Sequence, residues 1–94
     1  METHPLSKSF PLGQTVVTRN ALKSLHPADV YHGLQRHAVC DWGDLCPEDI
    51  EENNRSLEHG CRLLSAYRDR NGVKFWIITE ADRSATTVLL PEDY

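Results

Sequence analysis

The sequence predicts an α+β fold, in which two to three short helices are followed by a three-stranded antiparallel meander. Helix-starting prolines and helical spacing of apolar residues mark the stretch 20–60. Runs rich in β-branched and aromatic residues mark the stretch 62–90, where an Asn-Gly pair separates two of them. A shorter β-branched run at 15–18 would add a fourth strand at an N-terminal edge of the sheet.

Composition bounds the class of protein. Hydrophobic residues make up 39% and charged residues 26% of the 94 residues, which is typical of a folded globular domain. Residues 1–12 read as a flexible lead-in before a single domain over residues 13–94. No apolar run approaches the ~20 residues of a membrane helix, and we expect no secretory signal before the domain. The three cysteines form no disulfide framework, so we expect reduced thiols, a cytoplasmic location and no membrane contact.

Capping residues place the first two helices. Asn20 is a good N-cap for a short helix that runs through Leu25. Pro27 suits the first position of a second helix, because the proline ring fixes a helical φ there. Helical spacing then predicts an apolar stripe formed by Val30, Tyr31, Leu34 and Ala38.

A third helix is predicted from Pro47, with Gly60 as the residue that ends it. Acidic residues fill its first turn, where the helix dipole favours negative charge. Its inner face is mixed, with two apolar residues and two amides: Ile50, Leu57, Asn53 and Asn54. A buried Asn is costly unless it finds hydrogen-bond partners, so Asn53 and Asn54 are candidate binding residues.

The back half predicts strands at 62–68, 74–80 and 86–90, and Pro91 ends the last because proline cannot extend the ladder. Asn71-Gly72 is the strongest signal for a two-residue hairpin turn. Such a turn would set the pairs Tyr67–Trp76, Ala66–Ile77 and Leu64–Thr79. It would place on one face Leu63, Tyr67, Trp76 and Ile78. Helices would cover one face, and the N-terminal segment, a partner protein or a second copy in a homodimer would cover the other.

The charge is low and unevenly spread. A net charge of −4 argues against sequence-independent binding of nucleic acid, which depends on many Lys and Arg contacts to phosphates. Residues 41–58 hold seven acids and one base, whereas residues 62–74 hold four bases and one acid. A local basic face on an acidic protein is one reading, and ordinary solvated surface is the other.

Residue types that bind zinc occur at His37, Cys40, Cys46, His59 and Cys61. Their spacing contains no Cys-x-x-Cys unit, and the last two lie on either side of a predicted helix end. Neither a glycine-rich nucleotide loop nor a Gly-x-Ser-x-Gly motif occurs. We therefore expect no metal and no cofactor, and enzyme activity stays open.

Two polar groups could carry chemistry. His37, Asp41 and Asp44 fall within the reach of one loop around Trp42, and a His beside a carboxylate is the usual general acid or base. Helix capping by His37 and Asp41 is the structural alternative. The second group lies in the last turn of the meander and contains Thr79, Glu80, Asp82, Arg83, Ser84 and Thr86. An Arg beside hydroxyls suits a phosphate or a carboxylate, and a turn held by local hydrogen bonds of Asp82 is the alternative.

Three runs of sequence, at 37–45, 63–67 and 76–94, resemble a family of uncharacterised proteins of about this length. Its members are encoded on bacterial plasmids and integrative elements and are described as plasmid-related. Residues 13–14 and 20–22 resemble the opening of that family. The resemblance implies a mobile-element setting and no particular activity. Cys40 stands where the family has Gly, which argues against a zinc or redox role for this cysteine.

The favoured hypothesis is therefore an accessory protein of a bacterial mobile element that binds an unknown protein partner. Its basis is the acidic third helix, the two-faced apolar sheet and the lack of a catalytic motif. One alternative is a ribonuclease-like enzyme, because the layout resembles small toxins of the barnase and RelE type. His37 would then be the acid–base group, and Arg83 and Thr86 would hold the phosphate. The other alternative is a small-ligand or nucleic-acid binder that uses Arg62, Arg68, Arg70 and Lys74.

Overall fold

The computed structural model describes residues 9–94, so residues 1–8 of the predicted lead-in lie outside the described residues. The rest of that lead-in contacts the domain, since the Phe10 N–H donates to the Ala38 carbonyl at 3.3 Å. The predicted α+β class is confirmed. The elements in chain order are β1 (Gln14–Val17), α1 (Arg19–Ser24), α2 (Pro27–Ala38), α3 (Pro47–His59), β2 (Leu63–Arg68), β3 (Lys74–Thr79), β4 (Ala85–Leu89) and the 3-10 turn η1 (Pro91–Asp93).

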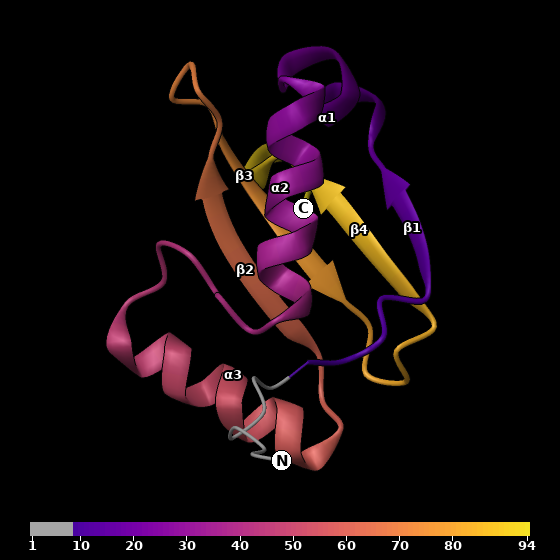
Figure 1. Cartoon of the computed structure of the whole chain (residues 1–94), viewed down its shortest axis with the longest axis vertical. Helices are drawn as coiled ribbons and strands as arrows, with labels where there is room; N and C mark the ends of the chain where they lie inside the picture. Colours follow the sequence, from indigo (N-terminus) through magenta and orange to yellow (C-terminus); the bar gives the residue numbers. More distant parts are fainter. Residues whose placement is uncertain (1–8) are drawn as a thin grey trace, which may run out of the picture.

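The four strands form one sheet in the order β1-β4-β3-β2, with α1 and α2 across one face and α3 near the start of β2 (Figure 1). β2, β3 and β4 are antiparallel neighbours, as a meander requires. The predicted fourth strand at the N-terminal edge is present as β1, but the expectation of an antiparallel sheet holds only in part, because β1 pairs with β4 in parallel. A parallel neighbour needs a long connection, and here the whole chain between β1 and β4 supplies it.

The helices begin at residues that suit their first turns. Pro27 and Pro47 occupy the first positions of α2 and α3, as predicted. The N-cap predicted at Asn20 is wrong, because Thr18 caps α1 with a hydroxyl that accepts the Ala21 N–H at 3.1 Å. Thr18 is the residue that follows β1 directly, so the same side chain ends the strand and starts the helix.

The face that α2 turns toward the sheet differs from the predicted stripe. Tyr31, a predicted member, is 61% exposed, and the buried positions of the helix are Gly33 and His37. A Cβ at Gly33 would lie 3.1 Å from the Phe75 ring, so glycine lets the helix approach the sheet closely at this point. Two predicted members do pack against the core: Val30 and Leu34.

The predicted register of the β2–β3 hairpin is wrong by one residue. Tyr67 lies opposite Phe75 rather than Trp76, because the connecting loop has three residues instead of two. The Asp69 carboxylate explains the change, since it accepts the Asn71 N–H at 2.8 Å and the Val73 N–H at 3.0 Å. A shift of one residue moves every side chain of one strand to the other face. The predicted assignment of side chains to the two faces is therefore wrong, because Tyr67 shares its face with Phe75 and not with Trp76.

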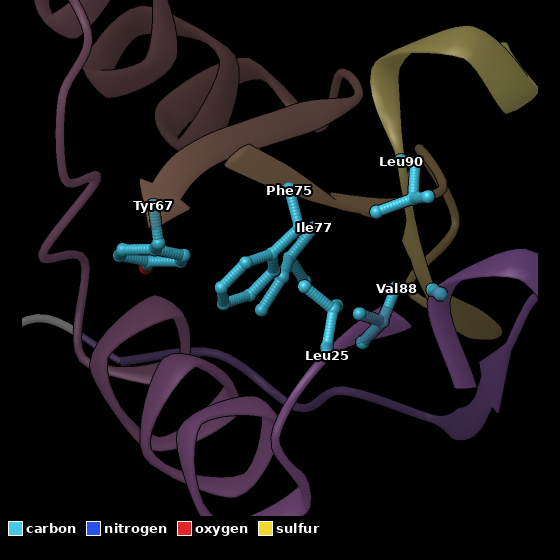
Figure 2. Packing of buried hydrophobic residues seen from close by; sticks show 7 residues of the cluster. Leu25, Tyr67, Phe75, Ile77, Val88 and Leu90 are labelled. Carbon is cyan, nitrogen blue, oxygen red and sulfur yellow. The ribbon is translucent and has the colours of Figure 1, made fainter. Parts of the chain in front are cut away.

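The hydrophobic core lies between the sheet and the first two helices. Figure 2 shows Phe75 and Ile77 at its centre, between Tyr67 on one side and Val88 on the other. Burial of a large apolar side chain contributes about 2–3 kcal/mol, so this layer supplies much of the stability. The remaining buried members of the cluster are Ala21, Leu25 and Leu90.

On the second face of the sheet, η1 and the final residue cover part of the surface, and none of the helices described for residues 9–94 lies across it. The ring of Tyr94 lies 5.8 Å from the ring of Trp76 on this face. Asp93 ties this end of the chain to the β1–α1 junction, because its carboxylate accepts from Thr18 and Asn20, each at 2.7 Å. These hydrogen bonds lower the pKa of Asp93, so the carboxylate stays ionised and keeps the tie.

Candidate functional site

The segment after α2 closes the outer edge of β2. Cys40 has a φ of 67° and sits at the end of α2 in the left-handed position that glycine usually takes. The chain then runs beside β2, where Gly43 pairs with Ala66. The Ala66 N–H donates to the Trp42 carbonyl at 3.1 Å, and the Asp44 N–H donates to the Ala66 carbonyl at 2.7 Å. The predicted site segment therefore covers the edge of β2 through one isolated β-bridge.

Asn53 extends this cover by one more residue of β2. Its side-chain oxygen accepts the Leu64 N–H at 3.2 Å, and its amide nitrogen donates to the Leu64 carbonyl. The amide thus imitates a neighbouring strand, which explains an Asn buried on a helix. Asn54 is exposed and accepts the indole N–H of Trp42 at 3.1 Å, which holds that loop against α3.

Replacing Asn53 with Ala is expected to lower the free energy of unfolding by about 1–3 kcal/mol, because both backbone groups of Leu64 lose their partner. Asn54→Ala is the matched control on the same helix, since it removes a single side-chain contact. Urea denaturation of both variants checks the prediction. Equal losses for the two variants would contradict the edge-closing role of Asn53.

His37 is completely buried and lies in a chain of hydrogen bonds across the core face of the sheet. Its Nδ1 lies 2.5 Å from the Ser65 hydroxyl on β2, and its Nε2 lies 2.8 Å from the Thr79 hydroxyl on β3. Thr79 in turn lies 2.7 Å from the Thr86 hydroxyl on β4, which donates to the Leu12 carbonyl at 2.7 Å. One helix, three strands and the segment before β1 therefore share one polar chain.

The hydrogen bond at one end of this chain determines which atom donates in each of the others. Each hydroxyl has one proton, and the Thr86 hydroxyl donates its proton to the Leu12 carbonyl. Thr86 must then accept from Thr79, and Thr79 must accept from the Nε2–H of His37. His37 is left with an acceptor at Nδ1, which takes the Ser65 proton. A neutral imidazole satisfies every partner, and burial lowers the pKa of His37 to about 4, with the nearby Arg83 charge acting in the same direction.

Arg83, the predicted anion-binding residue, is committed to the backbone. Its guanidinium lies 5.7 Å from the centre of the Phe10 ring and donates to four carbonyl groups at 2.7–3.4 Å. Those carbonyls belong to Cys61, Glu80, Ala81 and Ser56. Arg83 therefore joins the last turn of the sheet to the end of α3.

The other residues of the predicted turn site also have local partners. Asp82 accepts the Ser84 N–H at 3.0 Å, which is the structural alternative stated for this turn. The Glu80 carboxylate lies 3.6 Å from the Arg62 guanidinium. The Asp82 and Ser84 side chains are exposed, whereas Thr86 is buried in the core chain described above.

The predicted acid–base group does not assemble around His37. Asp41 is exposed and forms two contacts to the Arg36 guanidinium, at 2.7 and 3.2 Å, which lower the pKa of Asp41. Asp44 is exposed and lies 3.9 Å from Arg68. The ring of Trp42 does contact the ring of His37, with ring centres 5.7 Å apart, but this is a packing contact between two rings. The cluster thus separates into a buried chain and a paired surface.

A groove of about 490 Å³ lies on the second face of the sheet, beside α3. Its floor is apolar and formed chiefly by Leu64, Trp76 and Ile78. One wall is a single face of α3, because its residues are spaced as i, i+3, i+4 and i+7: Asp49, Glu52, Asn53 and Ser56. The groove is also lined by Arg62 and Tyr94, whose guanidinium and hydroxyl are 3.1 Å apart.

Asn53 is a predicted binding residue, but the groove that it lines does not follow from the predicted register. Only the observed pairing puts Leu64, Trp76 and Ile78 on one face. The spacing of the acids along α3 was the signal that could have pointed to a polar wall.

The basic stretch 62–74 is largely neutralised. Arg62, Arg68 and Arg70 each face a carboxylate, and Arg70 contacts Asp29 at 3.0 and 3.1 Å. Within residues 9–94, no group of three or more His, Cys, Asp and Glu side chains could hold a metal ion. The helices of the described part are all too short or too polar to cross a membrane.

Comparison with known proteins identifies no relative of this chain. The chain matches no protein-family model, no curated protein and no solved structure. The groove and the buried chain are therefore interpreted from their own geometry.

Proposed function

We propose that this chain is a non-catalytic binding module, which holds a segment of a protein partner in the groove between α3 and the second face of the sheet. The observation that carries the proposal is the floor of the groove. Leu64 on the edge strand β2 and Trp76 on the central strand β3 are only partly buried there. Apolar side chains that form a concave surface with a polar rim are typical of interaction sites.

The polar residues support binding over catalysis. A general acid or base must reach substrate, and His37 is buried with both ring nitrogens engaged by hydroxyl groups. Arg83 has its donors on backbone carbonyls, so it is not available for a phosphate. The ribonuclease-like alternative therefore lacks an accessible group among its own residues. The paired arginines likewise weaken the nucleic-acid alternative.

The cellular setting is part of the same proposal. The resemblance to plasmid-related proteins implies an accessory role in a bacterial mobile element. A small module without its own catalytic group suits such a role, because it would act by binding another protein.

Photocrosslinking at the groove tests the proposal. A benzophenone amino acid replaces Tyr94, which lines the groove, or Tyr31, which is 61% exposed on α2 and away from it. Inside a bacterial host, we expect an adduct with one protein from position 94 and none from position 31. The adduct should disappear when the floor is changed by Trp76→Ala or Leu64→Asp.

Two floor substitutions are used because one of them could unfold the domain, so the melting temperature of each is measured alongside. The variant that keeps the wild-type melting temperature decides the result. An adduct that persists in that variant, or one that forms equally from both positions, overturns the groove as the binding site. Absence of any adduct from position 94 also counts against it.

A further inference from the structure

The charged side chains that line the groove differ in how far they are neutralised. Asp49 and Glu52 lie on the α3 wall, within a stretch that has six more acids than bases, residues 41–58. Glu52 is paired with Arg55 at 2.7 Å, and Arg62 is paired with Glu80 and bonded to Tyr94. Asp49 forms no ion pair within residues 9–94, so the rim along α3 keeps a negative charge.

We infer that the partner segment is a basic amphipathic one, with apolar anchors for the floor and Lys or Arg residues along the α3 side. This inference rests on the proposed function and adds the chemistry of the partner. Opposite charges across the rim of an interface favour association and select the orientation of the segment. An apolar anchor is required because Leu64 and Trp76 offer no charged group at the floor.

The shape of the groove favours a single chain segment over a broad surface. The α3 wall runs from Asp49 to Ser56, so the groove follows about two turns of the helix. Amphipathic peptides bind such grooves through apolar residues on one face, with their charged residues at the rim. A volume of about 490 Å³ holds a few side chains rather than a folded domain.

Selection from a displayed library of random peptides of ~15 residues, a length sufficient for a short helix, tests the inference. Peptides are selected on the wild-type protein and depleted on Leu64→Asp. We expect the selected peptides to combine aromatic or aliphatic residues with an excess of Lys and Arg.

A charge reversal provides the matched test. In the protein with Asp49→Lys and Glu52→Lys, binding of the selected peptides should fall about tenfold or more, and a fresh selection should favour Asp and Glu. Glu48→Lys with Glu51→Lys is the control, since both side chains are exposed on the same helix and do not line the groove. This control should keep the wild-type preference for basic peptides, because its reversed charges lie outside the groove. The net charge changes equally in both variants, so a difference between them reports the position of the charges.

The outcomes separate the inference from the function on which it rests. Groove-dependent peptides without a basic excess, or peptides indifferent to the reversal at positions 49 and 52, overturn the inference and leave the groove as a binding site. Peptides that bind Leu64→Asp equally well, or a library that yields no binder, overturn both.

Self-association is measured by sedimentation, because α1 of a second copy also offers an exposed apolar residue between two basic ones. This residue is Leu22, 69% exposed, between Arg19 and Lys23. Oligomers that Leu22→Asp and Leu64→Asp each abolish would show that a second copy fills the groove and would overturn the inference.

Discussion

Lowering the pH from 7 to 4 is expected to remove about 3 kcal/mol of stability through His37 alone. The pKa of His37 is about 4 in the fold, against 6.5 for an ordinary His, because burial disfavours the imidazolium. Each pH unit between the two values corresponds to ~1.4 kcal/mol. Below pH 6.5 the unfolded chain binds more protons than the folded one, so stability is complete above 6.5 and declines toward pH 4. Urea denaturation at intervals of pH measures the loss.

The control for this prediction is His37→Asn, which cannot ionise and still offers one donor and one acceptor. This variant should be less stable at pH 7 but nearly independent of pH between 6.5 and 5. The pKa values of five aspartates are lowered from 3.8, so their contributions start to decline only below about pH 5 and leave the interval from 6.5 to 5 to His37. These aspartates are Asp29, Asp41, Asp69, Asp82 and Asp93. A wild-type protein with equal stability at pH 7 and 4.5 would contradict a neutral buried His37.

The parts of the fold that follow from neighbouring residues could be predicted from the sequence. Pro27 and Pro47 start helices because a proline needs no N–H partner in the first turn, and Gly60 ends α3 with a φ of 71°. The strands of the meander were placed within one residue by their β-branched and aromatic content. These signals act over a few residues, so no knowledge of the tertiary structure is needed to read them.

The predicted register of the β2–β3 hairpin was wrong because a contact with a distant part of the chain stabilises the loop. Asn-Gly favours a two-residue turn, but the Asp69 carboxylate binds two N–H groups of the loop and also the His26 N–H before α2. Asp29 holds the same loop from α2 through Arg70. A carboxylate that joins residues 43 positions apart leaves no local pattern in the sequence.

The candidate site shows the same limit. Asn53 was predicted as an amide on the inner face of a helix and His37 as a candidate acid–base group, and both are buried. Their partners lie on strands that are 11 to 42 residues away in the chain. Residue types alone therefore indicated a special environment but could not distinguish a reactive group from a satisfied structural one.

Replacing Gly43 with Ala is expected to destabilise the protein by about 2–4 kcal/mol more than the same change at Gly72. Both glycines have positive φ, 77° and 82°, so the backbone strain of a Cβ is similar at the two positions. At Gly43 the new Cβ would lie 2.0 Å from the Ala66 carbonyl oxygen and 2.7 Å from the Tyr67 ring. At Gly72 nothing lies within 4 Å, so the control isolates the steric overlap.

The overlap must separate the 42–44 segment from β2, because neither the Ala66 carbonyl nor the Tyr67 ring can move without disturbing the core. Both hydrogen bonds of Ala66 along that edge would then be lost, each with a net value of about 1 kcal/mol. Trp42, which is 4% exposed and packs on His37, would lose its position as well. Urea denaturation gives the difference in stability, and hydrogen exchange at the Ala66 and Asp44 amides locates it. If exchange at those amides is unchanged and the two glycine variants are equally stable, the edge formed by residues 42–44 does not hold β2 in place.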